Sequence, residues 1–341
     1  MTSQASRDKA IFEFQGGLHL RDTVLWLDAP TPRQLCFISH ADVPGASAHQ
    51  KILATERTAE LLRALGAAHG RGRHAHEPQA LVTPYGRPFA LGQLTLELFP
   101  SGNLLGAASL LIKHRGQEII YSGEVNPRSS PLVERLETRQ CDVLVIGCRF
   151  GERRFTFPPF GQVVEGLVRF AREALQRGQT PVFFCEPVGE SQDLTRILLE
   201  AGVPVRAHRL HCVASRVYER AGSPLEGLAC HRRRGEVTPA ALLWPPRLRT
   251  SPALERLGEL RTAFVSGLAL DEETRAAADC EAAFALSAQA DYPGIVQYVQ
   301  ACKPKQVLLG GGCGSDLAED LAALGMEVSS LGSPEQMDLV F

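Results

Sequence analysis

The sequence contains 341 residues, of which 44% are hydrophobic and 22% charged, and its formal net charge is −2. This composition is typical of a globular protein that is long enough for two domains. A net charge near zero excludes a general basic field, so any nucleic-acid-binding surface must be local. The sequence has no apolar run near the roughly 18 residues that cross a bilayer, and its N-terminus lacks the order of a signal peptide. We therefore expect a cytoplasmic protein with no membrane partner.

Short apolar runs separated by turn residues dominate the first part of the chain. They include "TVLWLDA", "LCFISH", "LTLELFP", "SLLIKH", "QEIIYSG" and "DVLVIG". Such runs predict strands in stacked sheets. One helix is expected among them, where Thr55 can cap "ERTAELLRALG" and Gly66 can end it.

From about Phe160 the pattern changes to alternating helices and strands. The strand-like runs "PVFFCEP", "PVRAHR" and "ALLWPP" are separated by helical segments. This alternation predicts a parallel sheet covered by helices. The first of these helices should bury one apolar face, formed by Val163, Val164, Leu167, Phe170, Ala171 and Leu175.

The tail of the sequence returns to a mixed pattern. Helices are expected over "YPGIVQYVQAC" and "SDLAEDLAALG", with a strand over "KQVLLGGG" between them. Leu317, Leu321 and Leu324 would form the buried stripe of the last helix. A strand-rich opening, a βα middle and a mixed tail together indicate one domain that is interrupted by another.

The nine cysteines are scattered singly, with no CxxC pair. Several of them, such as Cys36, Cys141 and Cys185, lie inside apolar runs. This distribution predicts reduced and mostly buried thiols in a cytosolic protein.

The segment "CFISHADVPGASAHQ", residues 36–50, begins like a metal-binding loop. It follows an apolar run and opens on Ser39, His40 and Asp42. Hydrolytic two-metal centres use clustered His and Asp side chains from loops at strand ends, because imidazole and carboxylate bind the ions that activate water. The rest of this segment offers few such ligands. The protein is therefore either a hydrolase with an unusual centre or a protein that has lost the chemistry.

A resemblance to a known family covers nearly the whole chain. The segments "LWLDAPTPRQLCFISHA", "ILATERTAELLRALG", "PYGRPFALGQLTLELFPSGNLLGAASLLI", "EIIYSGEVN", "CDVLVIGCRFG", "FVSGLAL" and "SAQADYPGIVQYV" carry it. The chain resembles the metallo-β-lactamase superfamily, in particular its β-CASP nuclease branch and the bacterial exonucleases associated with DNA ligase, which are kin of messenger-RNA 3′-end processing nucleases. The resemblance implies an αββα sandwich formed by residues 1–155 and 264–341, interrupted by an α/β β-CASP domain at 156–263.

The same resemblance implies which positions held metal ligands. The HxHxDH loop of the family matches at Ser39 and His40, and Asp42 stands either at the second His or, after a two-residue deletion, at the Asp. The acidic residue of a further motif is replaced around Gly147 in "GCRFG", and the late His-Gly falls on Gly310 or Gly311. The positions that have departed from the family's ligands are thus Asp42, Asn103 in "PSGNLLGAA", Glu124 in "YSGEVN", Gln289 in "SAQAD", and Gly311.

These replacements predict a catalytically degenerate protein. Asn and Gln bind zinc or manganese only through weak neutral oxygens, and Gly offers no side-chain donor. One alternative is an active hydrolase or exonuclease that holds a single zinc or manganese ion on His40, Asp42 and Glu124. Another alternative is a scaffold protein that binds no nucleic acid.

A basic cluster in the βα middle is the candidate nucleic-acid-binding surface. Arginine binds phosphate through charge-assisted hydrogen bonds, although solvated loops are also commonly basic. The sequence does not distinguish single-stranded DNA from RNA. The resemblance implies an active β-CASP paralogue or a DNA ligase or helicase assembly as partner. The candidate residues of the cluster are Arg206, Arg209, Arg232, Arg233 and Arg234.

Overall fold

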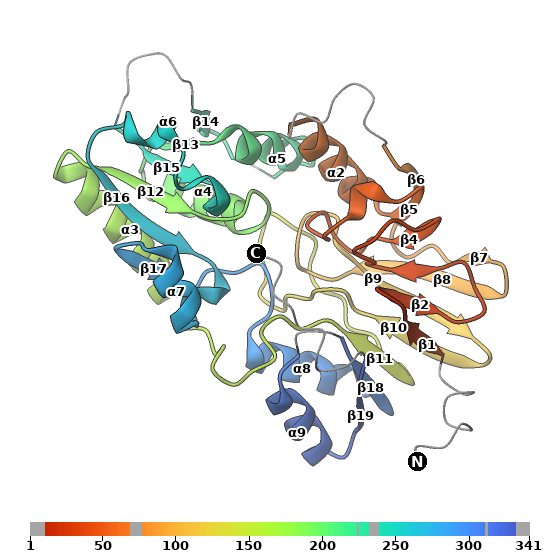
Figure 1. The fold of residues 1–341 in the computed structure, drawn as a ribbon. Coiled ribbons are helices and arrows are strands. Elements are labelled where there is room, and N and C mark those ends of the chain that lie inside the picture. Colours follow the sequence, from red (N-terminus) through yellow and green to blue (C-terminus); the bar gives the residue numbers. More distant parts are fainter. Residues whose placement is uncertain (1–10, 69–76, 224, 232–238, 311–312, 332–341) are drawn as a thin grey trace.

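The computed structural model describes residues 11–68, 77–223, 225–231, 239–310 and 313–331 (Figure 1). This part of the chain forms a mixed α/β protein with three β-sheets, which we call sheets A, B and C. Among its helices, none is both long and apolar enough to cross a membrane.

Sheet A contains six strands from the first quarter of the chain, in sequential order. Its first three strands are antiparallel and the remaining neighbours are parallel. Its elements are β1 (Phe12–Phe14), β2 (Leu18–Leu20), β3 (Trp26–Leu27), β4 (Leu35–Phe37), η1 (Ala46–Ala48), β5 (Lys51–Ala54), α2 (Glu56–Ala68) and β6 (Gln79–Val82).

Sheet B joins the middle of the chain to its end, in the order β19-β18-β11-β10-β9-β8-β7. Strands β7 to β10 pair antiparallel, whereas β10, β11, β18 and β19 pair parallel. Its strands are β7 (Phe89–Leu91), β8 (Leu94–Pro100), β9 (Ala108–His114), β10 (Gln117–Tyr121), β11 (Val143–Ile146), β18 (Gln306–Leu309) and β19 (Glu327–Ser330), and its helices are α8 (Tyr292–Cys302) and α9 (Ser315–Ala323).

Sheets A and B pack face to face, as the sequence predicts. Strand β8 alternates buried and more exposed residues, so Leu94, Leu96 and Leu98 all enter the shared core, which they form with side chains of sheet A such as Leu27 and Phe37. On the far side of sheet A, Leu62 of α2 packs onto the strands. On the far side of sheet B, buried side chains of α8 and α9 pack onto β11 and β18. The result is a four-layered body with helices outside both sheets.

Sheet C forms between residues 180 and 284, within the long connection from β11 to β18. All of its paired strands are parallel, which confirms the prediction from the βα alternation. Helices cover both of its faces (Figure 1). Its elements are α3 (Phe160–Gln176), β12 (Thr180–Phe184), α4 (Glu190–Glu200), β13 (Val205–Ala207), α5 (Arg209–Arg220), β14 (Ala229–Cys230), β15 (Ala241–Trp244), η2 (Pro246–Leu248), α6 (Pro252–Glu255), β16 (Leu260–Val265), η3 (Gly267–Leu270), α7 (Glu272–Ala278) and β17 (Ala282–Phe284).

The predicted helices form, with two differences at their ends. The Thr55 hydroxyl accepts the Thr58 amide at 3.2 Å and caps α2, as expected, but the helix continues past Gly66 to Ala68. In α9, Leu317 and Leu321 are buried, whereas Leu324 is 48% exposed. The prediction for Leu324 was wrong because the helix ends at Ala323, so the periodicity no longer aims the next side chain at the core.

The prediction of reduced thiols was also wrong for four of the nine cysteines. Disulfides join Cys148 to Cys313 and Cys212 to Cys230. Residues 148 and 313 are 165 positions apart and meet only because β11 and β18 are neighbours. Spacing along the sequence therefore gave no sign of either pair.

Candidate functional site

The candidate site lies where several strands end between the two-sheet body and sheet C. Ser39, His40 and Asp42 follow β4, and Glu124 follows β10. The loop after β11 begins with Gly147. A Cβ atom added to Gly147 would lie 3.8 Å from Oε1 of Glu124, so this residue faces the Glu124 carboxyl. The structure thus brings His40, Asp42 and Glu124 into one region.

Asp28 organises the floor of this region, and sequence reasoning missed it. Its carboxylate accepts hydrogen bonds from the Ser39 amide at 2.7 Å, the Ser39 hydroxyl at 2.5 Å and the Tyr121 hydroxyl at 2.8 Å. Its φ of 41° is unusual for a residue other than glycine. Burial raises its pKa to about 6 in spite of these bonds. An Asp directly after an apolar run, in "LWLDAP", was the available signal.

His40 is held as a neutral ring. Its Nδ1 lies 2.8 Å from the Ser39 hydroxyl, which itself donates to Asp28. The ring therefore donates its Nδ1 proton to that oxygen. Burial lowers the pKa of His40 to about 4, so the ring carries no charge near neutral pH.

Asp42 and Glu124 are carboxyls in a recess. Asp42 is exposed to solvent and Glu124 is half-buried, yet both are surrounded by enough protein atoms for desolvation to raise the pKa of each to about 7. A carboxyl that has many protein atoms around it and still contacts solvent lies in a concave part of the surface. The negative charge of Glu186 raises the pKa of Asp42 further, while the guanidinium of Arg149 lowers the pKa of both carboxyls.

Sheet C supplies the opposite side of this recess. Glu186 follows β12 and Glu190 begins α4, so both stand at the carboxyl edge of the parallel strands, where α/β sheets bind ligands. Burial, with Asp42 and Glu186 nearby, raises the pKa of Glu190 to about 7. Arg247, in η2 after β15, lowers the pKa of Asp42 and Glu186. We call the set Asp42, Glu124, Glu186, Glu190, Arg149 and Arg247 the recess cluster.

Asn103 and Gln289 are amides at positions where metal ligands were expected. Asn103 is buried, and within the part of the chain that the structure describes neither of its side-chain polar atoms has a hydrogen-bond partner. The Oε1 of Gln289 is likewise unpartnered among these residues. Asn103 lines a small cavity with Arg128 and Asp193, between the two-sheet body and α4. The loop that carries Asn103 requires glycine at position 102. Gly102 has a φ of 72°, and a Cβ atom added to it would lie 2.4 Å from a backbone oxygen.

The donor set does not fit a metal ion. Over the described ranges, no group of three or more His, Cys, Asp or Glu side chains is placed to hold one. His40, Asp42 and Glu124 therefore do not form the reduced site that one alternative requires. Gly311 lies outside the described residues, so the structure says nothing of that position.

The candidate arginines are only partly described. Arg206 lies half-buried in β13, and Arg209 opens α5 and donates to the Ala68 carbonyl at the end of α2. Arg209 therefore contributes to the contact between sheet C and the two-sheet body. Arg232, Arg233 and Arg234 lie outside the described residues.

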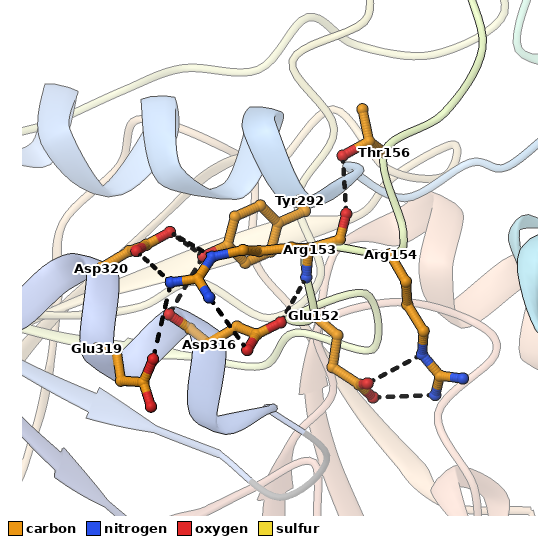
Figure 2. A network of polar contacts seen from close by, with 8 residues as sticks. All are labelled: Glu152, Arg153, Arg154, Thr156, Tyr292, Asp316, Glu319 and Asp320. Carbon is orange, nitrogen blue, oxygen red and sulfur yellow. Dashed lines mark hydrogen bonds and ion pairs between the residues drawn. The ribbon is translucent and has the colours of Figure 1, made fainter.

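Two arginines fix the connection that leaves the recess after β11, and Figure 2 shows the contacts of the first, Arg153, with α9. Arg153 binds Asp320 of α9 at 2.6 Å, and its amide donates to Asp316 at 2.9 Å. Arg154 binds Asp271, the residue that caps α7, at 2.5 Å. Arg153 therefore ties the connection to the two-sheet body, and Arg154 ties it to sheet C.

Comparisons with known proteins bear on this arrangement. No family model matches the chain. The chain is 31% identical over 332 residues to a protein of Opitutus terrae named "Probable DNA ligase", with 96% of the chain aligned. It spans only 32% of the length of that relative. It also shares its fold with the crystal structure of a protein of unknown function from Enterococcus faecalis V583, at a TM-score of 0.53 and 13% identity, over 81% of this chain and 74% of the other.

Proposed function

We propose that this protein is a catalytically degenerate homologue of β-CASP nucleases of the metallo-β-lactamase fold. It would act as a nucleic-acid-binding or complex-forming subunit in DNA processing. The observation that carries the proposal is the chemistry at the expected ligand positions, where Asn103 and Gln289 are amides with unpartnered atoms. Amides in place of imidazoles at these two positions remove ligands that a two-metal centre needs.

The layered fold supports the proposed family. Helices cover the outer faces of sheets A and B, and sheet C arises between β11 and β18 of sheet B. In the proposal, residues 1–155 and 264–341 form the metallo-β-lactamase domain and 156–263 the β-CASP domain. Strands β16 and β17 extend sheet C to Phe284.

The Opitutus terrae protein supports the proposed link to DNA. A segment similar to this chain occupies about a third of a protein named for DNA ligation. We infer that this chain works beside a DNA ligase, and that an active β-CASP paralogue or a helicase are further partners. Single-stranded DNA or RNA would be its ligand, and the cytoplasm its location.

Two measurements on the purified protein test the proposal. Metal analysis after dialysis, followed by a nuclease assay with added manganese, should find no stoichiometric ion and no cleavage. Binding of a single-stranded oligonucleotide should weaken steeply as salt rises, because phosphate contacts release counterions. One or two tightly held ions with nuclease activity would establish the active hydrolase instead. If the protein binds no strand even at low salt, the result would favour the alternative of a scaffold protein that binds no nucleic acid.

A further inference from the structure

Arg149 turns to solvent beside the recess from between two buried neighbours in the loop after β11. Its neighbours on both sides, Cys148 and Phe150, are each only 2% exposed, whereas Arg149 itself is exposed. Cys148 is tied to Cys313 by a disulfide, and an added Cβ at Gly151 would lie 3.2 Å from the Cys313 Cα. The loop is therefore anchored on both sides of Arg149, so its guanidinium is presented from a rigid support.

The guanidinium of Arg149 is shared by several carboxyls and bound by none of them. Arg149 follows Gly147, where an added Cβ would lie 3.8 Å from Oε1 of Glu124, and its charge lowers the pKa of Asp42, Glu124 and Glu186. Within the described residues, however, its side chain forms no ion pair or hydrogen bond. No described residue thus occupies its five donors, and a guanidinium matches the geometry of a phosphate.

A second cation approaches the same carboxyls from sheet C. Arg247 lowers the pKa of Asp42 and Glu186, as Arg149 does. The two arginines come from different parts of the structure, one from the loop after β11 and the other from η2 after β15. An anion between them would touch both sides of the recess.

We propose that Arg149, together with Arg247, binds a phosphate group of a nucleic-acid strand in this recess. The inference rests on the proposed function and names the chemistry of the ligand at the same site. A fixed organic cation would then perform the charge-neutralising part of what metal ions do in active nucleases. No catalysis follows from this contact, because it activates no water.

Binding of labelled single-stranded oligonucleotides to the whole chain tests the inference. Oligonucleotides with a 5′-phosphate, a 3′-phosphate or no terminal phosphate distinguish a chain end from an internal phosphate. Arg149→Met should weaken binding about tenfold, the loss expected for one charge-assisted contact, and Arg149→Lys should weaken it less. Arg177→Gln is the matched control, because it removes an exposed positive charge after α3, at the amino edge of sheet C.

The outcomes separate this inference from the proposed function. If the wild type binds strands and Arg149→Met equals Arg177→Gln, the inference fails and the proposed function stands. If the wild type binds no strand, the nucleic-acid-binding part of the proposed function fails. In that case inorganic phosphate tests the anion site alone. If phosphate protects the wild type but not Arg149→Met against thermal unfolding, the inference that Arg149 binds an anion stands. If phosphate affects both proteins equally, that inference fails.

Discussion

The guanidinium of Arg128 binds the carboxylate of Asp193 at 2.5 Å and thereby joins the two-sheet body to α4. The Ser130 hydroxyl donates to the second oxygen of the same carboxylate at 2.9 Å. Asp193 is nearly buried, and Arg128 also donates to the Ser287 carbonyl at 3.2 Å. This cluster connects three stretches of chain that are distant in sequence.

Arg128→Met should therefore be strongly destabilising. It leaves the Asp193 charge buried with only one side-chain partner, which costs roughly 2–4 kcal/mol of unfolding free energy. Urea unfolding at pH 8 measures the loss. Arg196→Met is the matched control, since Arg196 forms an i,i+4 pair with the exposed Glu200 and should lose less than about 0.5 kcal/mol. Equal losses in the two variants would show that Arg128 is no more than a surface charge.

The disulfide between Cys148 and Cys313 should contribute measurably to stability. It closes a loop of 165 residues and joins the segment after β11 to the segment after β18, beside the recess. Cys148→Ser and Cys313→Ser should each lower the free energy of unfolding by about 2–4 kcal/mol, mainly by relaxing the unfolded chain. Urea unfolding of the wild type with and without a phosphine reductant should show a difference at least as large, because the reductant also opens the disulfide between Cys212 and Cys230.

Cys280→Ser controls for the loss of a thiol, because Cys280 is half-buried and outside both disulfides. It should leave the reductant effect unchanged. A wild type whose unfolding does not respond to reductant would contradict a stabilising disulfide. The measurement also bears on the expected cytoplasmic location, where thiols are usually kept reduced.

The sequence was most informative where a local rule governs the structure. α8 occupies the predicted segment "YPGIVQYVQAC" in full, because Asp291 caps it and a buried stripe runs along it. Long-range pairs followed no such rule. Asp28 meets Tyr121 only after sheets A and B have stacked, and Cys212 meets Cys230 only after β13 and β14 have paired. The resemblance pointed to Asp42 and Glu124, but their raised pKa values come mainly from burial in the folded chain, where sheet C also places Glu186 near Asp42.

Glu124 should make stability fall as the pH rises. Its pKa is raised in the folded protein from 4.5 to about 7, so the folded state binds the proton more tightly than the unfolded chain. Its favourable contribution is complete below about pH 4.5 and is lost as the pH rises through about 7. Glu124→Gln removes this dependence, so the variant should exceed the wild type by roughly 1–2 kcal/mol at pH 8 and converge with it at pH 5.

Urea unfolding at several pH values between 5 and 8 measures the difference between these proteins. Glu165→Gln, at an exposed position of α3, is the control for the loss of a carboxylate outside the recess. A Glu124→Gln curve parallel to that of the wild type would mean that Glu124 titrates in the folded protein as it does in the unfolded chain.

Asn103→Leu should stabilise the protein or leave it unchanged, although the site is buried. The Asn103 amide has no hydrogen-bond partner among the described residues, so burying it costs about 1–3 kcal/mol that an apolar side chain of similar size avoids. We expect a gain of up to about 1 kcal/mol in unfolding free energy, since part of the benefit is lost in fitting the branched side chain. Urea unfolding at pH 7 measures it.

Asn126→Leu is the matched control in the lining of the same cavity. The Asn126 amide donates to the Ala288 carbonyl at 2.8 Å, and its oxygen accepts the Arg128 amide at 2.9 Å. Removing it strands both partners, so this variant should lose about 1–3 kcal/mol. If Asn103→Leu is destabilising to the same degree, Asn103 has a polar partner in the folded protein. The amide at this position would then have a structural role, and the proposed loss of a metal ligand would need support from Gln289 alone.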